Sequence, residues 1–547
     1  MASNSQVYLT GPLDNLVREL HDFLGLEVDT EMGKGKAMLS GSSFNFPSYK
    51  LDLPEFIQAL PKKVEWEDRV FLESKGVFSL PELVLRRELL RAFVENVYPF
   101  LPVLDLHSFL ASAVNEKTID CRSPISLLLF HAVMFSATAF VELKHLFCAG
   151  YTSRKEAREQ FYLRARTLYD FDIESDRIVL IQALLLMTYW HETPENPKDS
   201  HYWLDVCWSL GASIGLDRTL FDSDPAMPTG TQGLWKRLWW CLYTRDVLLA
   251  LNFRRPLSYR NSKTGHRPEV LACEEFNITR YPRRIVDALG SCAFLEDVAA
   301  QRHVAVAFIE KAKLCILVSE VLLLRDIGQG TQVNTSPQLF DDRWIEVVHA
   351  LEAWHDDLRY PLERSAQHSS ANKPAESRII YVQRAWLAVI YLTALGTLHR
   401  EAARELVSGS TERGSPGVLP GTYTKITLDT IGILENMNYR GLVQYLPTST
   451  VAILVPVLLN RVIDLGGATD GSDPLIQTQK FGQFYRGMQV LATLGEVYPS
   501  AKDIQIFFEG MLWRGDEPMP VVVRGLLTRV EQREYARAAL GRLRGGV

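Results

Sequence analysis

Apolar residues recur at helical spacing along most of this 547-residue sequence. After residue 83, for example, Leu85, Leu89 and Phe93 follow one another every fourth position, which places them on one face of an α-helix. No segment alternates apolar and polar residues for long enough to predict a strand. The sequence therefore predicts an all-α fold: a large irregular helical bundle or array with no substantial β-sheet.

The expected helices cover most of the chain. We expect them at residues 12–25, 83–97, 125–141, 153–169, 178–190, 203–214, 234–251, 298–325, 341–358, 379–404, 424–437, 448–464, 477–497 and 518–540. Residues 125–141 form the longest apolar run, but polar residues such as His131 interrupt it, and it is short for a bilayer. We expect this run to be a buried core helix and predict no contact with a membrane.

The chain divides into three expected parts. Residues 1–60 are expected to hold an N-terminal helix and a flexible linker, because glycines and serines are frequent from residue 29 to residue 50. Residues 61–510 are expected to form one helical body, since the polar stretches between its helices are typical of surface loops. Residues 511–547 are expected to be an arginine-rich helix and tail.

Composition and charge exclude several classes of protein. Hydrophobic residues make up 47% of the chain and charged residues 23%, which is typical of a folded soluble protein. The net charge of −6 opposes binding to a phosphate backbone, so we expect DNA contact to be indirect or absent. The seven cysteines never form a Cys-x-x-Cys pair, and we predict neither a metal site nor a cofactor. The N-terminus lacks the pattern of a secretory signal, which predicts a reducing compartment.

An aromatic-rich helix expected at 234–251 carries one carboxylate on its buried stripe. Asp246 shares that stripe with Trp239, and a buried carboxylate needs a cation or backbone amides beside it. Arg254 and Arg255 follow the expected end of the helix, where the chain can fold back on Asp246. We take these three charged residues as the candidate site. It is either an effector pocket or, as the preferred interpretation, a structural ion pair.

Several short motifs point to one family. They are Tyr98-Pro-Phe-Leu-Pro-Val-Leu-Asp105, Ile181-Gln-Ala-Leu-Leu-Leu-Met187, Gly211-Ala-Ser-Ile-Gly-Leu-Asp-Arg218, Gly233-Leu-Trp-Lys-Arg-Leu-Trp-Trp-Cys-Leu-Tyr-Thr-Arg-Asp246, Thr397-Leu-His-Arg400 and Gln444-Tyr-Leu-Pro447. In this order the chain resembles the all-helical middle homology region of fungal binuclear zinc-cluster transcription regulators, in the branch typified by cutinase transcription factor beta. The resemblance spans roughly residues 70 to 500.

This resemblance implies gene regulation in the nucleus rather than catalysis. It implies control of a metabolic or secondary-metabolite gene set through protein partners, either a zinc-cluster transcription factor or a second copy of the chain, or through a small-molecule effector. Members of the family usually carry a six-cysteine cluster that binds two zinc ions and reads DNA, whereas the first cysteine here is Cys121. We therefore expect a regulator without its own zinc-cluster module, and a truncated zinc-cluster factor is the alternative.

An enzyme on a helical scaffold is another alternative, and two motifs could belong to such an enzyme. Gly211-Ala-Ser-Ile-Gly215 matches the nucleophile elbow of hydrolases and would make Ser213 a nucleophile, but no strand is expected before it. His191, Glu192 and His201 surround a proline-containing loop and could hold a metal ion, although their spacing fits no helical ligand pair. We expect no catalysis from either set.

Two basic segments are interpreted as protein surface rather than as binding sites. Gly33-Lys-Gly-Lys36 lacks the remaining positions of a phosphate-binding loop, which favours a basic surface loop. The C-terminal segment holds Arg529, Arg533 and Arg537 at four-residue intervals with glutamates between them. This pattern favours a solvated helix face over a nucleic-acid contact.

Overall fold

The computed structural model describes residues 53–61, 64–114, 124–190, 198–216, 229–261, 269–290, 292–328, 337–358, 378–408, 421–466 and 474–513. These residues lie in one compact unit, Leu53–Val547. The unit takes in residues 53–60, which the sequence analysis assigned to the N-terminal part. The expected helices at 12–25 and 518–540, the Gly33–Lys36 loop and the C-terminal arginines lie outside the described residues.

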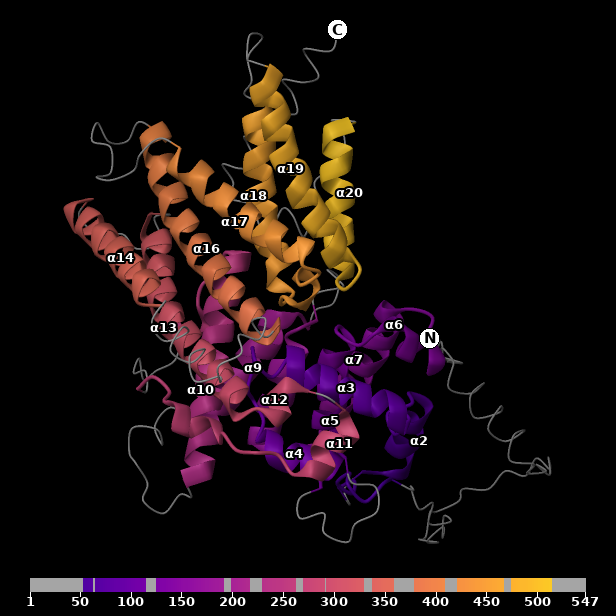
Figure 1. Ribbon diagram of the computed structural model, residues 1–547. Helices are drawn as coiled ribbons and strands as arrows, with labels where there is room; N and C mark the ends of the chain where they lie inside the picture. The colour runs from indigo at the N-terminus through magenta and orange to yellow at the C-terminus, as the bar shows by residue number, and fades with distance from the viewer. Residues whose placement is uncertain are drawn as a thin grey trace, which may run out of the picture. The chain divides into compact units, whose positions relative to one another are not determined.

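The described part of the chain is built from α-helices (Figure 1). They are α2 (Trp66–Ser74), α3 (Leu83–Asn96), α4 (Leu106–Ala113), α5 (Leu127–Thr138), α6 (Leu143–Cys148), α7 (Arg154–Asp170), α8 (Arg177–Met187), α9 (Ser200–Ser213), α10 (Thr229–Phe253), α11 (Arg283–Leu289), α12 (Ala293–Glu296), α13 (Val298–Gly328), α14 (Pro337–Asp357), α16 (Arg378–Ser408), α17 (Thr422–Tyr439), α18 (Ser449–Gly466), α19 (Pro474–Gly495) and α20 (Pro499–Trp513). Among the described residues there are also three 3-10 turns, η1 (Ser258–Asn261), η2 (Cys273–Phe276) and η3 (Val443–Tyr445). Within the described ranges there is no strand, only an isolated bridge from Ile57 to Ile125, and the all-α prediction is confirmed.

Polar caps explain why some helices begin where the sequence predicts. The Ser153 hydroxyl accepts a hydrogen bond from the Glu156 amide at 3.1 Å and starts α7. The Asp176 carboxylate accepts from the amides of Ile178 and Val179 and starts α8. Such caps satisfy backbone donors that have no partner inside the helix. The short helices α2, α4, α6, α11 and α12 were not predicted, because one or two turns show too little periodicity, and α20 was also missed.

The N-terminal helices pack around α5. All twelve residues of α5 are buried, and the helix contacts α3, α7 and α8. This confirms that the long apolar run is a core helix. A helix that is apolar on every side can be stable in water only when neighbours surround it. Helices α3, α5, α7, α8 and α9 therefore pack together as the N-terminal part of the unit, drawn in indigo to purple in Figure 1.

The long helix α10 connects the N-terminal helices to the later ones. It contacts α8 and α9, which precede it in the sequence, and α13 and α18, which follow it. Trp239 and Trp240 are fully buried, and the Trp239 ring stacks on Tyr243 with centroids 5.2 Å apart. The buried Arg237 donates hydrogen bonds to the Tyr98 hydroxyl at 3.0 Å and to the Leu104 carbonyl at 3.2 Å. These contacts fix α10 against the segment that follows α3.

The C-terminal helices form the rest of the unit. In this part α16 contacts α13 and α17, and α19 contacts α17, α18 and α20. Residues Arg378–Arg400 of α16 are long and apolar enough to cross a bilayer by length and composition, but 61% of the apolar window is buried inside the protein. That burial is what the core helix of a folded domain shows.

Two glycines of α19 provide a test of the packing between α18 and α19. A Cβ atom added at Gly487 would lie 2.6 Å from Cδ2 of the buried Leu458, whereas one added at Gly482 would meet nothing within 4 Å. We expect Gly482→Ala to raise the free energy of unfolding by about 0.5–1 kcal/mol, since alanine favours a helix. The free energy of unfolding of Gly487→Ala should be about 1–3 kcal/mol lower than that of Gly482→Ala, because the added methyl group overpacks the interface. Urea unfolding of both variants checks the difference, and equal stabilities would contradict the close approach.

Candidate functional site

Asp246 is buried in α10, as its stripe predicts, and it bonds to backbone amides. Its side chain accepts hydrogen bonds from the amide of Ser258 at 3.1 Å and from the amide of Tyr259 at 2.8 Å. The residue is 2% exposed. Burial raises the pKa of the carboxyl group to about 6, although the two amides act in the opposite direction. The carboxylate thus closes the loop after α10 by satisfying two amides of the η1 turn.

The two arginines of the predicted site lie in different surroundings. Arg255 is exposed and pairs with Asp199 at the start of α9, with 3.3 Å between Nη2 and Oδ2. Arg254 follows the last residue of α10 and has a φ angle of +53°. This is a left-handed backbone conformation that glycine usually adopts. No ion pair of Asp246 with either arginine is among the contacts of the described residues. The turn therefore brings the arginines near α9 and a cavity, and their predicted role as an effector site or ion pair stays a prediction.

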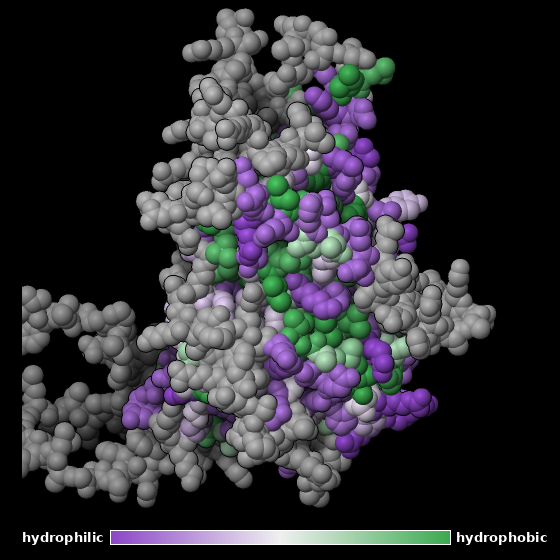
Figure 2. Space-filling view, turned by 90° about the vertical axis from the view of Figure 1, so that its left-hand side faces the viewer, coloured by the Kyte–Doolittle hydropathy of each residue, from purple (hydrophilic) through white to green (hydrophobic). Residues whose placement is uncertain are grey.

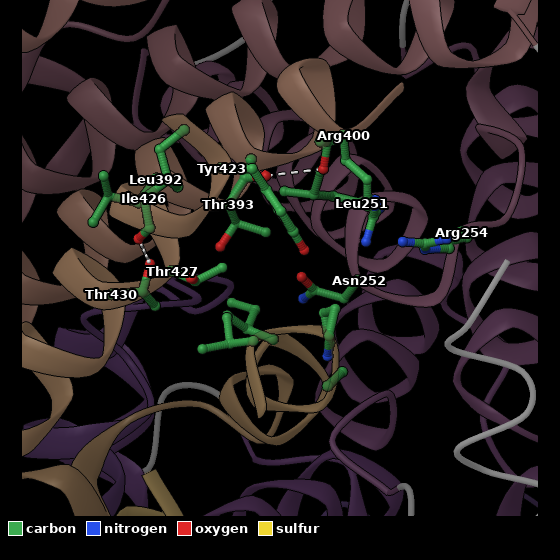
Figure 3. Close-up of a pocket in the computed structure, with 16 residues that line it drawn as sticks. Leu251, Asn252, Arg254, Leu392, Thr393, Arg400, Tyr423, Ile426, Thr427 and Thr430 are labelled. Carbon is green, nitrogen blue, oxygen red and sulfur yellow. Dashed lines mark hydrogen bonds between the residues drawn. The ribbon is translucent and has the colours of Figure 1, made fainter. Parts of the chain in front are cut away.

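The cavity beside Arg254 is enclosed by four helices, and we call it the Asn252 cavity. Its volume is about 40 Å³, and its lining residues are Leu251, Asn252, Arg254, Leu392, Thr393, Gly396, Thr397, Arg400, Tyr423, Ile426, Thr427, Thr430, Ala452, Ile453, Pro456 and Val457. Figure 3 shows Asn252 and Arg254 on the α10 side, with Thr393, Tyr423 and Thr427 supplied by α16 and α17. A volume of this size holds one or two water-sized groups. The cavity thus lies between helices that are distant in the sequence.

Asn252 is the polar residue of this cavity that lacks partners. The side chain is 6% exposed, and the described structure gives neither its Nδ2 nor its Oδ1 a hydrogen-bond partner. A buried amide without partners costs about 1–3 kcal/mol. Across the cavity Pro456 lies inside α18 and has no N–H to donate to the carbonyl four residues earlier. The cavity therefore offers the unsatisfied Asn252 amide to a small polar occupant.

A second hollow is more open. It measures about 700 Å³ and is formed by α14, α16 and α17, with Leu358, Ala385 and Ile433 among its apolar residues. Figure 2 shows the side of the unit on which α14 and α13 lie, where hydrophobic side chains gather between hydrophilic ones. The described residues thus line both the small Asn252 cavity and a wider surface hollow.

The residues of the alternative enzyme site are not assembled. Ser213 is exposed at the end of α9, where its hydroxyl donates to the Leu210 carbonyl at 2.6 Å and accepts from Arg177 at 3.1 Å. His201 belongs to the first turn of the same helix, about 18 Å away at 1.5 Å per residue. A nucleophile and its base must lie within hydrogen-bond reach, and these two do not.

The predicted metal-binding set is only partly described. His191 and Glu192 lie outside the described residues. Burial lowers the pKa of His201 to about 4, and the Arg255 charge adds to this shift. The searched part of the chain contains no group of three or more His, Cys, Asp or Glu side chains that could hold a metal ion. His201 thus lies beside Arg255 and Phe253 as a neutral ring of the α9–α10 contact.

The described geometry defines an all-helical domain organised around one central helix with a polar cavity beside it. Residues 90–356 match the fungal specific transcription factor domain. The chain is 34% identical over 477 residues to cutinase transcription factor 1 beta of Fusarium vanettenii, covering 84% of this chain and 53% of that protein. It is 28% identical over 502 residues to the transcription factor cpaR of Aspergillus oryzae, covering 88% of this chain and 81% of that protein.

A transcription factor of Fusarium pseudograminearum is 27% identical, over 82% of this chain and 51% of that protein. No solved structure matches the chain. The chain spans about half the length of two of these curated relatives. It belongs to the family of proteins that carry the fungal specific transcription factor domain, as the motifs from Tyr98 to Pro447 indicate.

The pKa of Asp246 gives a prediction with a definite sign. The pKa is about 6 in the folded chain against a usual 3.8, so the folded state binds the proton more tightly than the unfolded state does. The contribution of Asp246 to the free energy of unfolding is therefore complete below about pH 4. This contribution is lost as the pH rises to about 6, at up to about 1.4 kcal/mol per pH unit. Asp246→Asn keeps the shape and does not titrate.

The free energy of unfolding of the wild type minus that of Asp246→Asn should thus fall between about pH 4.5 and pH 6.5 and then level off. Urea unfolding of both proteins across this range measures the difference. A difference that does not change with pH, or that rises with it, would show that the folded carboxyl group is not held as described.

Proposed function

We propose that this chain regulates transcription in the nucleus and has no enzymatic activity. The observation that carries the proposal is the similarity to cutinase transcription factor 1 beta over 84% of the chain. That similarity spans more residues than the domain match at 90–356. The Ser213 hydroxyl donates to the Leu210 carbonyl rather than to a base, which also supports a role in binding rather than catalysis.

The genes that it controls belong, in this proposal, to a metabolic or secondary-metabolite set. The names of several relatives support this choice. They include the cutinase transcription factors, the acetamidase regulatory protein of Aspergillus fumigatus and the fusaric acid cluster transcription factor FUB12 of Gibberella moniliformis. These names refer to a cutinase, to an acetamidase and to a fusaric acid cluster.

The mechanism that we propose is coupling through α10. A small polar effector bound in the Asn252 cavity would touch α10, α16, α17 and α18 at once. Since α10 also contacts α8 and α9, a change in its packing would reach the N-terminal helices. An effector that binds one arrangement more tightly shifts the population toward it. A partner protein that recognises one arrangement would then bind to a larger or smaller fraction of the molecules.

The partner in this proposal is another protein, either a zinc-cluster transcription factor or a second copy of this chain. The net charge of −6 supports an indirect contact with DNA, because the chain as a whole is repelled by phosphates. The open hollow between α14, α16 and α17 has room for apolar side chains of such a partner.

A reporter assay tests the regulatory role without assuming a DNA site. The full chain, fused to an unrelated DNA-binding module and expressed in a fungal host, should change transcription of a reporter that carries the matching sites. The DNA-binding module alone is the control. Nuclear accumulation of the fusion with no change in transcription would count against the proposal.

Asn252→Leu separates the cavity's role in regulation from its role in folding. Leucine has a similar size and removes the unpartnered amide, so the free energy of unfolding should stay within about 1 kcal/mol or rise. The effect on the reporter per nuclear molecule should nevertheless fall, because the effector loses its polar contact. Asn438→Leu, at a position of α17 outside the cavity, is the matched control. Equal reporter effects for both variants would remove the Asn252 cavity from the mechanism.

A further inference from the structure

Two buried cations face a separate, smaller cavity, which we call the Lys311 cavity. Arg245 of α10 is 6% exposed and Lys311 of α13 is 5% exposed. The volume of the cavity is about 20 Å³, and its lining residues are Phe100, Leu101, Tyr189, Thr244, Arg245, Leu248, Lys311, Trp386, Pro447 and Ser449. No carboxylate is among them. Two positive charges thus share one small hollow in the interior.

Lys311 is only partly satisfied by its neighbours. Its Nζ donates to the Phe100 carbonyl at 2.6 Å and lies 4.1 Å from the centre of the Phe308 ring. An ammonium group has three donors, and the structure gives this one a single hydrogen bond. Burial lowers the pKa of Lys311 to about 8, so the group is still mostly protonated at neutral pH. A charged ammonium therefore faces the cavity.

Arg245 is held in place by neutral groups. Its Nε donates to the Thr188 hydroxyl at 2.9 Å, and its Nη2 donates to the Thr188 carbonyl at 2.8 Å. Its guanidinium lies 4.9 Å from the centre of the Tyr189 ring. None of these contacts neutralises the charge. The guanidinium is thus fixed in position at the cavity wall without a counter-ion.

The carboxylates adjacent in sequence have other partners. Asp246 accepts hydrogen bonds from the amides of Ser258 and Tyr259. Glu310 bonds to Lys313 and to the Trp354 indole. Among the ion pairs of the described residues, none includes Arg245 or Lys311. The cavity therefore carries an excess of positive charge.

The start of α18 adds an unpartnered donor to the same cavity. Ser449 is the first residue of α18, is 2% exposed, and has no hydrogen-bond partner for its hydroxyl. It lines the cavity together with the two cations. The N-terminal end of a helix carries a partial positive charge. A hydroxyl donor, a helix end and two cations therefore point to an anion.

The volume of the Lys311 cavity limits the size of an anion that it can hold. A cavity of about 20 Å³ accepts one water-sized group, since about 10–15 Å³ suffices for a water molecule. Water alone would leave both charges uncompensated in a poorly solvated site, which costs several kcal/mol. An ion of halide size, or a carboxylate no larger than formate, fits this volume and compensates one of the two positive charges.

We propose that the cavity between Arg245, Lys311 and Ser449 is a binding site for one small monovalent anion, a halide or a formate-sized carboxylate. The bound anion links α10, α13 and the start of α18. Its binding free energy then adds to the stability of the contact between the N-terminal and C-terminal helices. The site differs from the Asn252 cavity in its lining residues and does not depend on the proposed effector.

The test is the dependence of thermal unfolding on the anion at constant ionic strength. The full chain is melted at pH 7 while sodium chloride replaces sodium gluconate, whose anion is too large for the cavity, and a parallel series uses sodium formate. We expect the midpoint to rise with chloride or formate, by about 1 °C for each tenfold increase above the dissociation constant. A rise with formate alone identifies the ligand as a carboxylate, and a rise with chloride identifies it as a halide.

Three variants assign the effect to this cavity. Lys311→Met removes one cation and should abolish the dependence, and Ser449→Ala should weaken it without loss of the fold. Lys313→Met, two residues along α13 with a side chain 49% exposed, is the matched control and should keep the full dependence. Identical melting of the wild type in chloride, formate and gluconate would overturn the proposal. So would an unchanged dependence in both Lys311→Met and Ser449→Ala.

Discussion

The burial of α10 is the constraint on which the rest of the structure depends. This helix contacts α8, α9, α13 and α18, and residues 237–252 are all buried, so a polar residue in this stretch needs a partner inside the protein. Arg237 finds the Tyr98 hydroxyl and the Leu104 carbonyl, and Asp246 finds two backbone amides. Arg245 bonds to Thr188 and also lines a cavity, and Asn252 lines a second cavity without a partner for its amide. Arg237 and Asp246 are thus held by hydrogen bonds to their partners, and the two cavities lie beside Arg245 and Asn252.

The helical fold could be predicted from the sequence because its signals are local. Apolar stripes such as Leu85, Leu89 and Phe93 lie within one helix, and Ser153 caps α7 a few residues from its bonding partner. The short helices α4 and α12 escaped prediction, since they span too few turns for a stripe to repeat. The start of α10 was also placed late, at residue 234 instead of Thr229, because its first turn lacks apolar residues.

The candidate site could be predicted only in part, because its contacts join distant segments. The sequence indicated that Asp246 is buried and needs partners, but the choice between a cation and backbone amides depends on how the η1 turn folds. Asn252 and Lys311 were missed. A signal was present for one of them: Arg245 and Asn252 are seven residues apart, so these two polar side chains share one face of a buried helix. The unsatisfied state of Asn252 depends on α16, α17 and α18, which no local pattern reveals.

The complete burial of α5 has a consequence for how this chain can be divided. Because every residue of α5 is buried, a fragment that contains this helix but lacks α7 or α8 would expose the apolar side that faces the missing helix, and such a surface favours aggregation. Fragments for crystallisation or partner screening should therefore keep α3 to α9 together. The same reasoning places the tolerated cut sites at the edges of this part of the chain, well away from the segment with α6 that joins α5 to α7.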